Sequence, residues 1–425
     1  MIKNSNYQLT NRTGITKLMP IYRLMIGNLI SFIGDQIYFI TLPLIVYNIT
    51  GSVVQMGIVA AIEKTANIFQ PITGVIADMI KKKNLLLIAD ALRSILVCTM
   101  GFLYIMNYLE MWHIYLGALL LGFFGQIYNT AEFSSIPLLC ENKDLHFVNS
   151  LDSGIYDMAM LIGPSIGGLV INIYNPGYAL LINGLSFLGT FLAVLSIHMP
   201  EHIVNEIDES KSYKAGVFFK KLAEDLRVGF KFVLKTPVIL YTNISLIFSA
   251  IGTTLFLTVM VFHFKSVLSL NAQDIGLLIS IGGIGAILGS ILTNYLKKYI
   301  SYINIIIIGL IVGGISIILF GTLKNYILIV LSNALGTFAV SLINPCIITL
   351  RQSTTPKHLL GRVQSTSRFM TWTLIPLSAY AAGLLSNSFG TSITIVAGGI
   401  IRIAAALILI KTSKKYIFRN RYPGR

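Results

Sequence analysis

The chain has 425 residues, of which 55% are hydrophobic and 12% are charged, and its mean hydropathy is +0.76. Soluble proteins normally have about 25% charged residues, so this composition excludes a soluble globular protein and indicates one that spans a bilayer. The formal net charge of +15 could suggest binding to nucleic acid, but the positions of the basic residues favour another explanation.

Apolar runs of about 20 residues, bounded by charges or turn residues, predict twelve membrane-spanning helices. In the first half they cover residues 20–47, 53–79, 84–106, 111–138, 145–172 and 177–198. In the second half they cover residues 237–263, 272–296, 303–322, 326–350, 361–387 and 390–411. We therefore expect an all-α integral membrane protein with an N-terminal six-helix half (1–199), a linker (200–236), and a C-terminal six-helix half with a tail (237–425).

The basic residues fall on alternate loops. One set of loops and both termini carry most of them, including Lys81 to Lys83, Lys143, Lys297, Lys298, Arg351, Lys357, Arg362 and the cluster from Lys411 to Arg421. The other loops carry only Lys265 and Lys324. This positive-inside pattern predicts that both termini and the linker are cytoplasmic, and it accounts for the net charge without a nucleic-acid partner.

The end of the second span carries a distinctive segment. Residues 74–84 read GVIADMIKKKN, and a fainter copy, GSILTNYLKK, covers residues 289–298. Gly289 follows Gly74 by 215 positions (289 − 74 = 215), and Lys297 follows Lys82 by the same offset. An offset of about half the chain predicts two duplicated halves.

The polar segment between the halves contains a second helical pattern. From Phe218 to Val233, apolar residues recur at helical spacing among lysines, an arginine and acids. This pattern predicts an amphipathic helix on the inner leaflet that joins the halves. A helix that binds a partner protein is the alternative interpretation.

These features resemble the major facilitator superfamily, and within it the proton-coupled drug and antibiotic exporters of the macrolide-efflux type. The resemblance rests on the Gly-x-x-x-Asp end of the second span with its basic loop, the two six-span halves and the linker. Further residues that carry it are Gly34-Asp35, Leu42-Pro43-Leu44, Thr50-Gly51-Ser52, Asp90-Ala91-Leu92-Arg93, Asn149-Ser150-Leu151, Gly163-Pro164, Gly167-Gly168 and Gly361-Arg362-Val363. The resemblance implies a transporter that works by alternating access, not an enzyme.

The resemblance also implies a cytoplasmic gate. Gly74 permits close helix approach, and Asp78 can hold an arginine of the opposite half, with Lys82 in the same loop. By family analogy the partner comes from the eleventh span, where Arg362 or Arg368 is available. The copy has Thr293 in place of Asp78, so the lock should depend on the first half. An aspartate that only caps a helix is the alternative.

The fifth span contains a group of residues that affect helix shape, namely Gly163, Pro164, Gly167 and Gly168. Proline removes a backbone hydrogen bond and glycine permits close packing, which predicts a bend or a tight contact. These residues either take part in gating or serve helix packing alone.

Ionisable residues inside spans are costly and therefore indicate function. Asp35, Glu63 and Glu132, in that order, are the candidates for carrying protons or binding a cation. Polar residues that share helix faces with these carboxylates, or that recur along the tenth span, are expected to line a central cavity. They are Asn28, Ser31, Tyr38, Asn67, Gln70, Asn129, Asn333, Thr337, Ser341 and Asn344. A fixed partner that neutralises each carboxylate is the alternative. Asp90 and Arg93, three residues apart, are expected to pair with each other or with a neighbouring helix.

Other chemistry has no signature in the sequence. The chain lacks a Walker phosphate loop, its three cysteines have no ligand spacing, and neither a metal nor a cofactor is expected. We therefore expect a secondary transporter in the cell membrane, a monomer that exports a small amphipathic compound such as a drug, an antibiotic or a secondary metabolite by proton antiport. Uptake of a nutrient by proton symport, movement of lipid, and a membrane sensor that transports nothing are the alternatives.

Overall fold

A computed structural model describes residues 18–70, 72–73, 76, 80–141, 144–199, 215–356 and 359–416, and every regular element in these ranges is a helix. Eleven helices in the described residues are long and apolar enough to cross a membrane. Of the expected span 53–79, the described residues show α3 (Val53–Thr65), the 3₁₀ turn η1 (Ala66–Phe69) and further helical residues at 70, 72, 73 and 76. Gly74 and Asp78 lie outside the described residues.

The other helices of the first half match the predicted spans to within three residues. They are α2 (Met19–Thr50), α5 (Lys82–Ile105), α6 (Met111–Leu139), α7 (Leu145–Ile173) and α8 (Pro176–Ser196). Gly51 ends α2 in the left-handed conformation (φ 60°), and the Ser52 side chain accepts a hydrogen bond from the backbone of Gln55 to begin α3. A tight turn therefore joins α2 to α3, and α3 packs mainly against α15 (Ile375–Phe389) and α6.

The second half contains α10 (Pro237–Ser266), α11 (Ala272–Leu296), α12 (Tyr302–Thr322), α13 (Tyr326–Thr354), α14 (Leu360–Trp372), α15 (Ile375–Phe389) and α16 (Thr391–Tyr416). The expected span 361–387 is divided between α14 and α15. Pro376 lies in the first turn of α15 and has no amide hydrogen to continue the helix, which explains the break.

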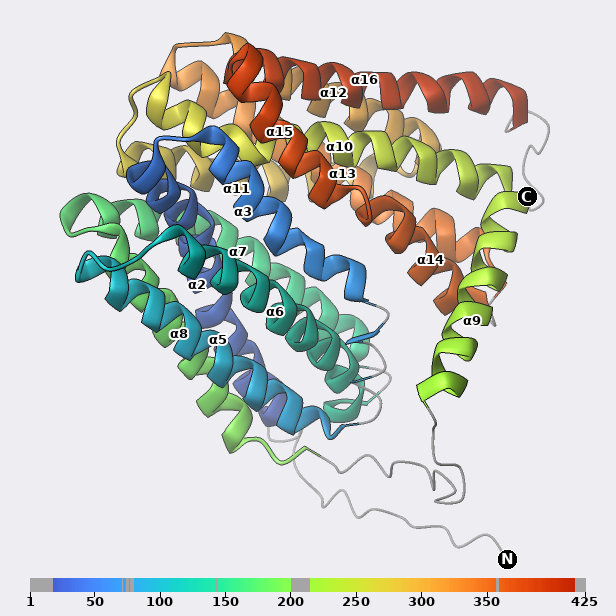
Figure 1. The fold of residues 1–425 in the computed structure, drawn as a ribbon. Helices are drawn as coiled ribbons and strands as arrows, with labels where there is room; N and C mark the ends of the chain where they lie inside the picture. Colours follow the sequence, from blue (N-terminus) through green and yellow to red (C-terminus); the bar gives the residue numbers. More distant parts are fainter. Residues whose placement is uncertain are drawn as a thin grey trace, which may run out of the picture.

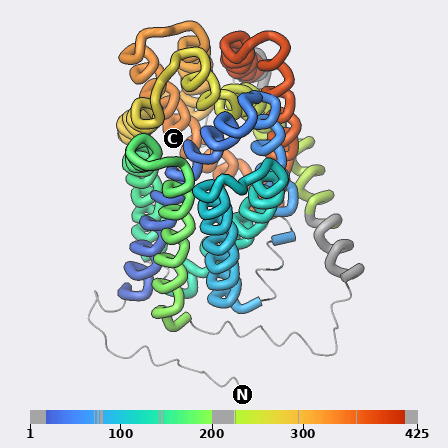
Figure 2. The backbone as a smooth tube through the Cα atoms, turned by 60° about the vertical axis from the view of Figure 1, so that its left-hand side comes forward, coloured from blue at the N-terminus to red at the C-terminus, as the bar shows by residue number. Residues whose placement is uncertain are grey.

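The duplication predicted from two short segments extends along the halves. The bounds of α6, moved by 215 positions, are the bounds of α13, and the start of α8 moved in the same way is the start of α16 (176 to 391). The two halves form separate bundles that lie one above the other in Figure 2.

The linker helix is α9 (Ala215–Lys235), as the amphipathic pattern predicted. Part of its apolar stripe packs on protein, because Val233 is buried with Ile239 and Val363, and Phe230 meets the ring of Phe369. Its exposed side carries Arg227, Lys231 and Lys235, one helical turn apart. The side chains of Phe218, Phe219 and Leu222 lie outside the described residues.

The halves pack together at one end of the molecule, here named the Gly51 end. An added Cβ at Gly57 would lie 2.9 Å from Gly383 Cα in α15. An added Cβ at Gly168 of α7 would overlap the carbonyl of Ala272 in α11. Toward the opposite end, which carries Lys83 and is named the Lys83 end, the two bundles diverge (Figure 1). The structure is therefore closed at the Gly51 end.

Candidate functional site

A buried polar network crosses the N-terminal half. The amide nitrogen of Asn28 (α2) donates to Glu132 Oε1 (α6), and the hydroxyl of Tyr128 donates to Asn28 Oδ1 at 2.7 Å. The Arg93 guanidinium (α5) pairs with Asp90 and lies 4.3 Å from the centre of the Tyr128 ring. This network holds α2, α5 and α6 together.

Arg93 is enclosed on both faces. Its guanidinium also lies 4.2 Å from the centre of the Phe187 ring of α8, and its exposed fraction is 5%. Aromatic faces attract a guanidinium, so this packing adds to the ion pair with Asp90. The expected pairing of Asp90 with Arg93 is present, and the cation also lies within electrostatic reach of Asp35 and Glu132.

The three candidate carboxylates differ in their partners. Glu132 is 7% exposed and accepts the hydrogen bond from Asn28. Glu63 pairs with Lys64 at 2.6 Å, although adjacent residues point in directions about 100° apart on a helix. Asp35 is half-buried, and no hydrogen bond or ion pair joins its carboxylate to another residue in the described part of the chain.

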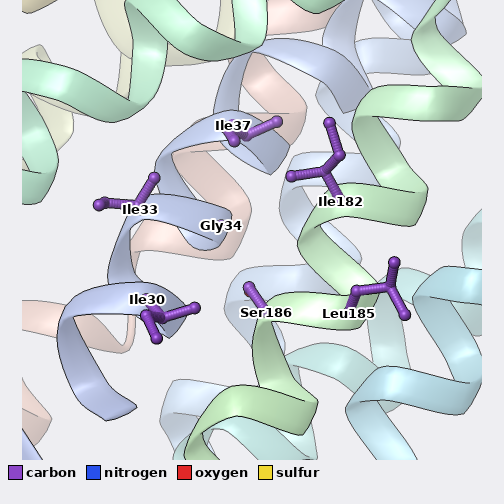
Figure 3. Close-up of a pocket in the computed structure, with 7 residues that line it drawn as sticks. All are labelled: Ile30, Ile33, Gly34, Ile37, Ile182, Leu185 and Ser186. Carbon is purple, nitrogen blue, oxygen red and sulfur yellow. The ribbon is translucent and has the colours of Figure 1, made fainter. Parts of the chain in front are cut away.

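Asp35 lies on a different side of α2 from the groove shown in Figure 3. This groove, about 350 Å³, lies between Ile30, Ile33, Gly34 and Ile37 of α2 and Ile182, Leu185 and Ser186 of α8. At about 100° per residue, Asp35 is turned away from these residues. Leu185 is 57% exposed, so the groove is an apolar outer surface, and the candidate site lies on the other side of α2.

Aromatic residues accompany Asp35. The Phe32 ring meets the ring of Tyr156 (α7) edge to face, with 5.6 Å between their centres. Tyr156 also lies within electrostatic reach of Asp35 and Lys64, which joins α2, α3 and α7 in one region. Sequence reasoning missed Tyr156, although its helical spacing to Met160 and Gly163 placed it on the glycine-bearing face of α7.

The predicted cavity residues of the first half fall in different environments. Ser31 is buried, and its hydroxyl has no hydrogen-bond partner in the described structure. The Tyr38 hydroxyl is likewise buried without such a partner. Asn67 and Gln70 are half-buried, and Asn129 is exposed.

In the second half, some predicted cavity residues connect helices. The Asn333 amide (α13) donates to the carbonyl of Leu278 in α11 at 2.8 Å, and the Thr337 hydroxyl donates to that of Gly282. Ser341 accepts a hydrogen bond from Thr293 through its carbonyl. Asn344 is exposed.

The glycines of α7 face two neighbours. Gly163 and Gly167 meet Gln36 and Ile37 of α2, whereas Gly168 meets α11 of the other half. The carbonyl of Pro164 lies beside Gly276 of α11. Small residues here let three backbones approach closely, so α7 is a junction between the halves.

The second half contains further buried cations. Arg351 donates to Asn243 Oδ1 at 2.9 Å and to Gln364 Oε1 at 3.3 Å. Arg402, which had no explanation from the sequence, is 4% exposed and donates to the Thr253 hydroxyl at 3.2 Å. Its guanidinium fits beside Gly313, where an added Cβ would lie 2.6 Å from Cζ.

Two related helical bundles that pack together at one end, with ionisable residues inside their spans, are typical of a multi-pass membrane transporter. Residues 24–377 match the sequence profile of the Major Facilitator Superfamily, and the chain belongs to this family. Members of this family are transporters of small molecules and not enzymes.

Sequence comparisons find distant relatives. The multidrug efflux pump Tap of Mycolicibacterium fortuitum is 22% identical over 390 residues, which cover 90% of this chain and 93% of Tap. The putative bacilysin exporter BacE of Bacillus amyloliquefaciens is 22% identical over 201 residues, 46% of this chain and 49% of BacE.

Solved structures share the fold. An inward-facing, unoccupied bacterial homologue of the human lysosomal transporter Spinster has a TM-score of 0.72 at 12% identity, with 97% of this chain and 100% of that one covered. An inward-facing bacterial homologue of the iron transporter ferroportin has a TM-score of 0.72 at 15% identity, with 95% and 100% covered. The nucleoside transporter NupG has the same TM-score at 14% identity, with 95% and 100% covered.

Proposed function

We propose that this transporter exports a small amphipathic compound, such as a drug, an antibiotic or a secondary metabolite, in exchange for protons. The likeness to a multidrug efflux pump over 90% of the chain supports export. The two bundles would rock about the substrate site, which is the usual motion of transporters built from repeats.

Asp35 carries the proposal for proton coupling. A coupling group has to exchange its proton with water or substrate, so it must be accessible and without a fixed partner. Asp35 is half-buried and has no such partner among the described residues, which supports this role, whereas Glu132 is buried and Glu63 pairs with Lys64. Asp35 is thus the first candidate, and its neighbours Arg93 and Glu63 would sense the change in its charge.

The orientation follows from the positive-inside pattern. The Lys83 end would be cytoplasmic, together with both termini and the linker, in the cell membrane. With the Gly51 end closed, the structure would then be the inward-facing state of a monomer divided into a half at 1–199, a linker at 200–236 and a half at 237–425.

The cytoplasmic lock belongs to the same proposal. Asp78 would hold Arg362 or Arg368 when the Lys83 end closes, and Gly74 and Lys82 would shape the segment around it. Because Gly74 and Asp78 lie outside the described residues, support comes from the sequence pattern and from the contact between α14 and η1, which brings the eleventh span to the second.

Transport into inverted membrane vesicles tests the proposal. With an imposed proton gradient, the wild type should accumulate a lipophilic cation or a macrolide, and Asp35→Asn should abolish gradient-driven accumulation while binding persists. Glu132→Gln is the comparison variant, and gradient-driven accumulation should persist in it because this second candidate carboxylate is buried within the N-terminal half. Failure to move any compound of a broad panel would refute export. Coupling that persists in Asp35→Asn would move the proton role to Glu63 or Glu132.

A further inference from the structure

Acidic residues are distributed very unequally between the halves. The chain from residue 237 to its end contains one, Asp274, which lies at the start of α11 near the Gly51 end. The spans of the first half contain seven: Asp35, Glu63, Asp78, Asp90, Glu132, Asp152 and Asp157. Arginines in the spans of the second half therefore have no carboxylate of their own half near the Lys83 end.

One of these arginines, Arg368, is exposed on α14. Gln364, Arg368 and Trp372 are one helical turn apart along α14. Val363 (1% exposed) and Ser367 (0%) bury the opposite side of α14 in its own half. Because α14 also contacts η1 of the first half, Arg368 lies on a helix that borders both halves.

A second arginine lies behind the first. Arg351 is 8% exposed, and its two hydrogen bonds go to neutral amides, one of them Gln364, a single turn from Arg368. Its Nε has no hydrogen-bond partner in the described structure. The two guanidiniums lie close enough to repel each other.

Two like charges in a membrane protein are costly without a counter-charge. A guanidinium binds a carboxylate with two parallel hydrogen bonds. The Trp372 ring, whose centre is 5.6 Å from Arg368 Cζ, offers an apolar face beside that position. The charge, the donors and the aromatic surface together fit the acidic group of an amphipathic molecule.

We propose that Arg368, supported by Arg351 and Trp372, binds a carboxylate of the transported compound, and that this compound is an amphipathic zwitterion. Its amine would lie toward the acidic wall of the first half, near Asp35 and Glu63. This inference rests on the proposed transport function and specifies its substrate class.

Binding to the purified protein in detergent, without any gradient, tests the inference. The probes are norfloxacin and the dipeptide Phe-Phe, each compared with its methyl ester, which keeps the amine and the apolar body but lacks the carboxylate. Wild type should bind each acid more tightly than its ester. Arg368→Gln should weaken binding of the acids about tenfold or more and that of the esters less than twofold.

Control variants separate this role from others. Arg368→Lys keeps the positive charge and should retain part of the preference for the acids. Arg227→Gln, on the exposed side of α9, should change neither the binding of the acids nor that of the esters. Equal loss for acid and ester in Arg368→Gln would overturn the inference, since a purely structural or gating arginine predicts that result. So would a wild type that binds the acids no more tightly than their esters.

Two further measurements identify the anion that Arg368 binds and distinguish this inference from the proposed function. In vesicles of neutral lipid and in vesicles with anionic lipid, the acid-selective effect of Arg368→Gln should be the same. An effect confined to anionic vesicles would overturn the inference in favour of a lipid headgroup. Because binding in detergent requires no proton gradient, acid-selective binding without export would refute the proposed function alone, and export without selectivity would refute the inference alone.

Discussion

The contact between α3 and α15 should control which end of the transporter is closed. At Gly57, an added Cβ would lie 2.9 Å from the carbonyl oxygen of Ala379 and from Gly383 Cα. This is 0.5 Å closer than the 3.4 Å at which ordinary van der Waals contact begins. Both neighbours are backbone atoms, so only movement of a helix relieves the overlap. Gly57→Ala, and more strongly Gly57→Leu, should therefore separate the halves at the Gly51 end.

The magnitude follows from the packing. Inserting methylene-sized groups into a packed site costs about 1–3 kcal/mol. If the cost applies only to the state closed at the Gly51 end, the population of that state falls by about 5-fold to 150-fold. The gain in helix propensity on replacing glycine, about 1 kcal/mol, applies to a helix in both states and therefore does not change this ratio. The same gain is expected at Gly154 of α7, where an added Cβ meets nothing within 4 Å, so Gly154→Ala and Gly154→Leu are matched controls.

Distances between spin labels measure the effect. Tyr108 (70% exposed) and Phe389 (62% exposed) lie in different halves at the Gly51 end and can each carry a label in a variant without native cysteines. The Gly57 variants should lengthen this distance, and the Gly154 variants should not. The same distance distribution in both series would refute the reasoning that close backbone packing at Gly57 holds this end shut.

Two further substitutions probe the second half. Arg402→Met should raise the free energy of unfolding by about 1–2 kcal/mol, because it removes a buried charge that has no carboxylate partner among the described residues, and a lower melting temperature in detergent would contradict this. Asn333→Leu should lower the free energy of unfolding by about 1 kcal/mol, because the Asn333 amide donates a hydrogen bond from α13 to α11. Asn344 is exposed, so Asn344→Leu should have little effect. Equal melting temperatures for the two variants would show that the hydrogen bond is not stabilising.

Much of the fold could be predicted because its signals are local or periodic. The bilayer requires about 20 apolar residues for each crossing, and the turn at Gly51 and Ser52 is encoded where it occurs. The division of the eleventh span was missed, although Pro376 was visible, because proline inside a membrane helix leads to a bend, a break or neither according to its neighbours. The constant offset of 215 positions also predicted the duplication before any contact was known.

The candidate site could be predicted only as a set of polar residues. The sequence showed that Asp35, Glu63 and Glu132 lie in spans and that such residues are expensive there. It did not show that Asn28 donates to Glu132, since these residues are 104 positions apart. Nor did it identify Tyr156 as a neighbour of Phe32, because that contact joins two different helices.

By itself, then, the sequence determined a membrane protein of two related helical halves and the residues that are costly to place in it, since hydrophobic length and charge are properties of single segments. The tertiary structure decided which of those costs are relieved. It pairs Asp90 with Arg93 and Glu63 with Lys64, and it leaves Asp35 and Arg368 without an ion-pair partner among the described residues. Ion pairs and hydrogen bonds depend on distances of a few ångströms between helices, and only packing sets those distances.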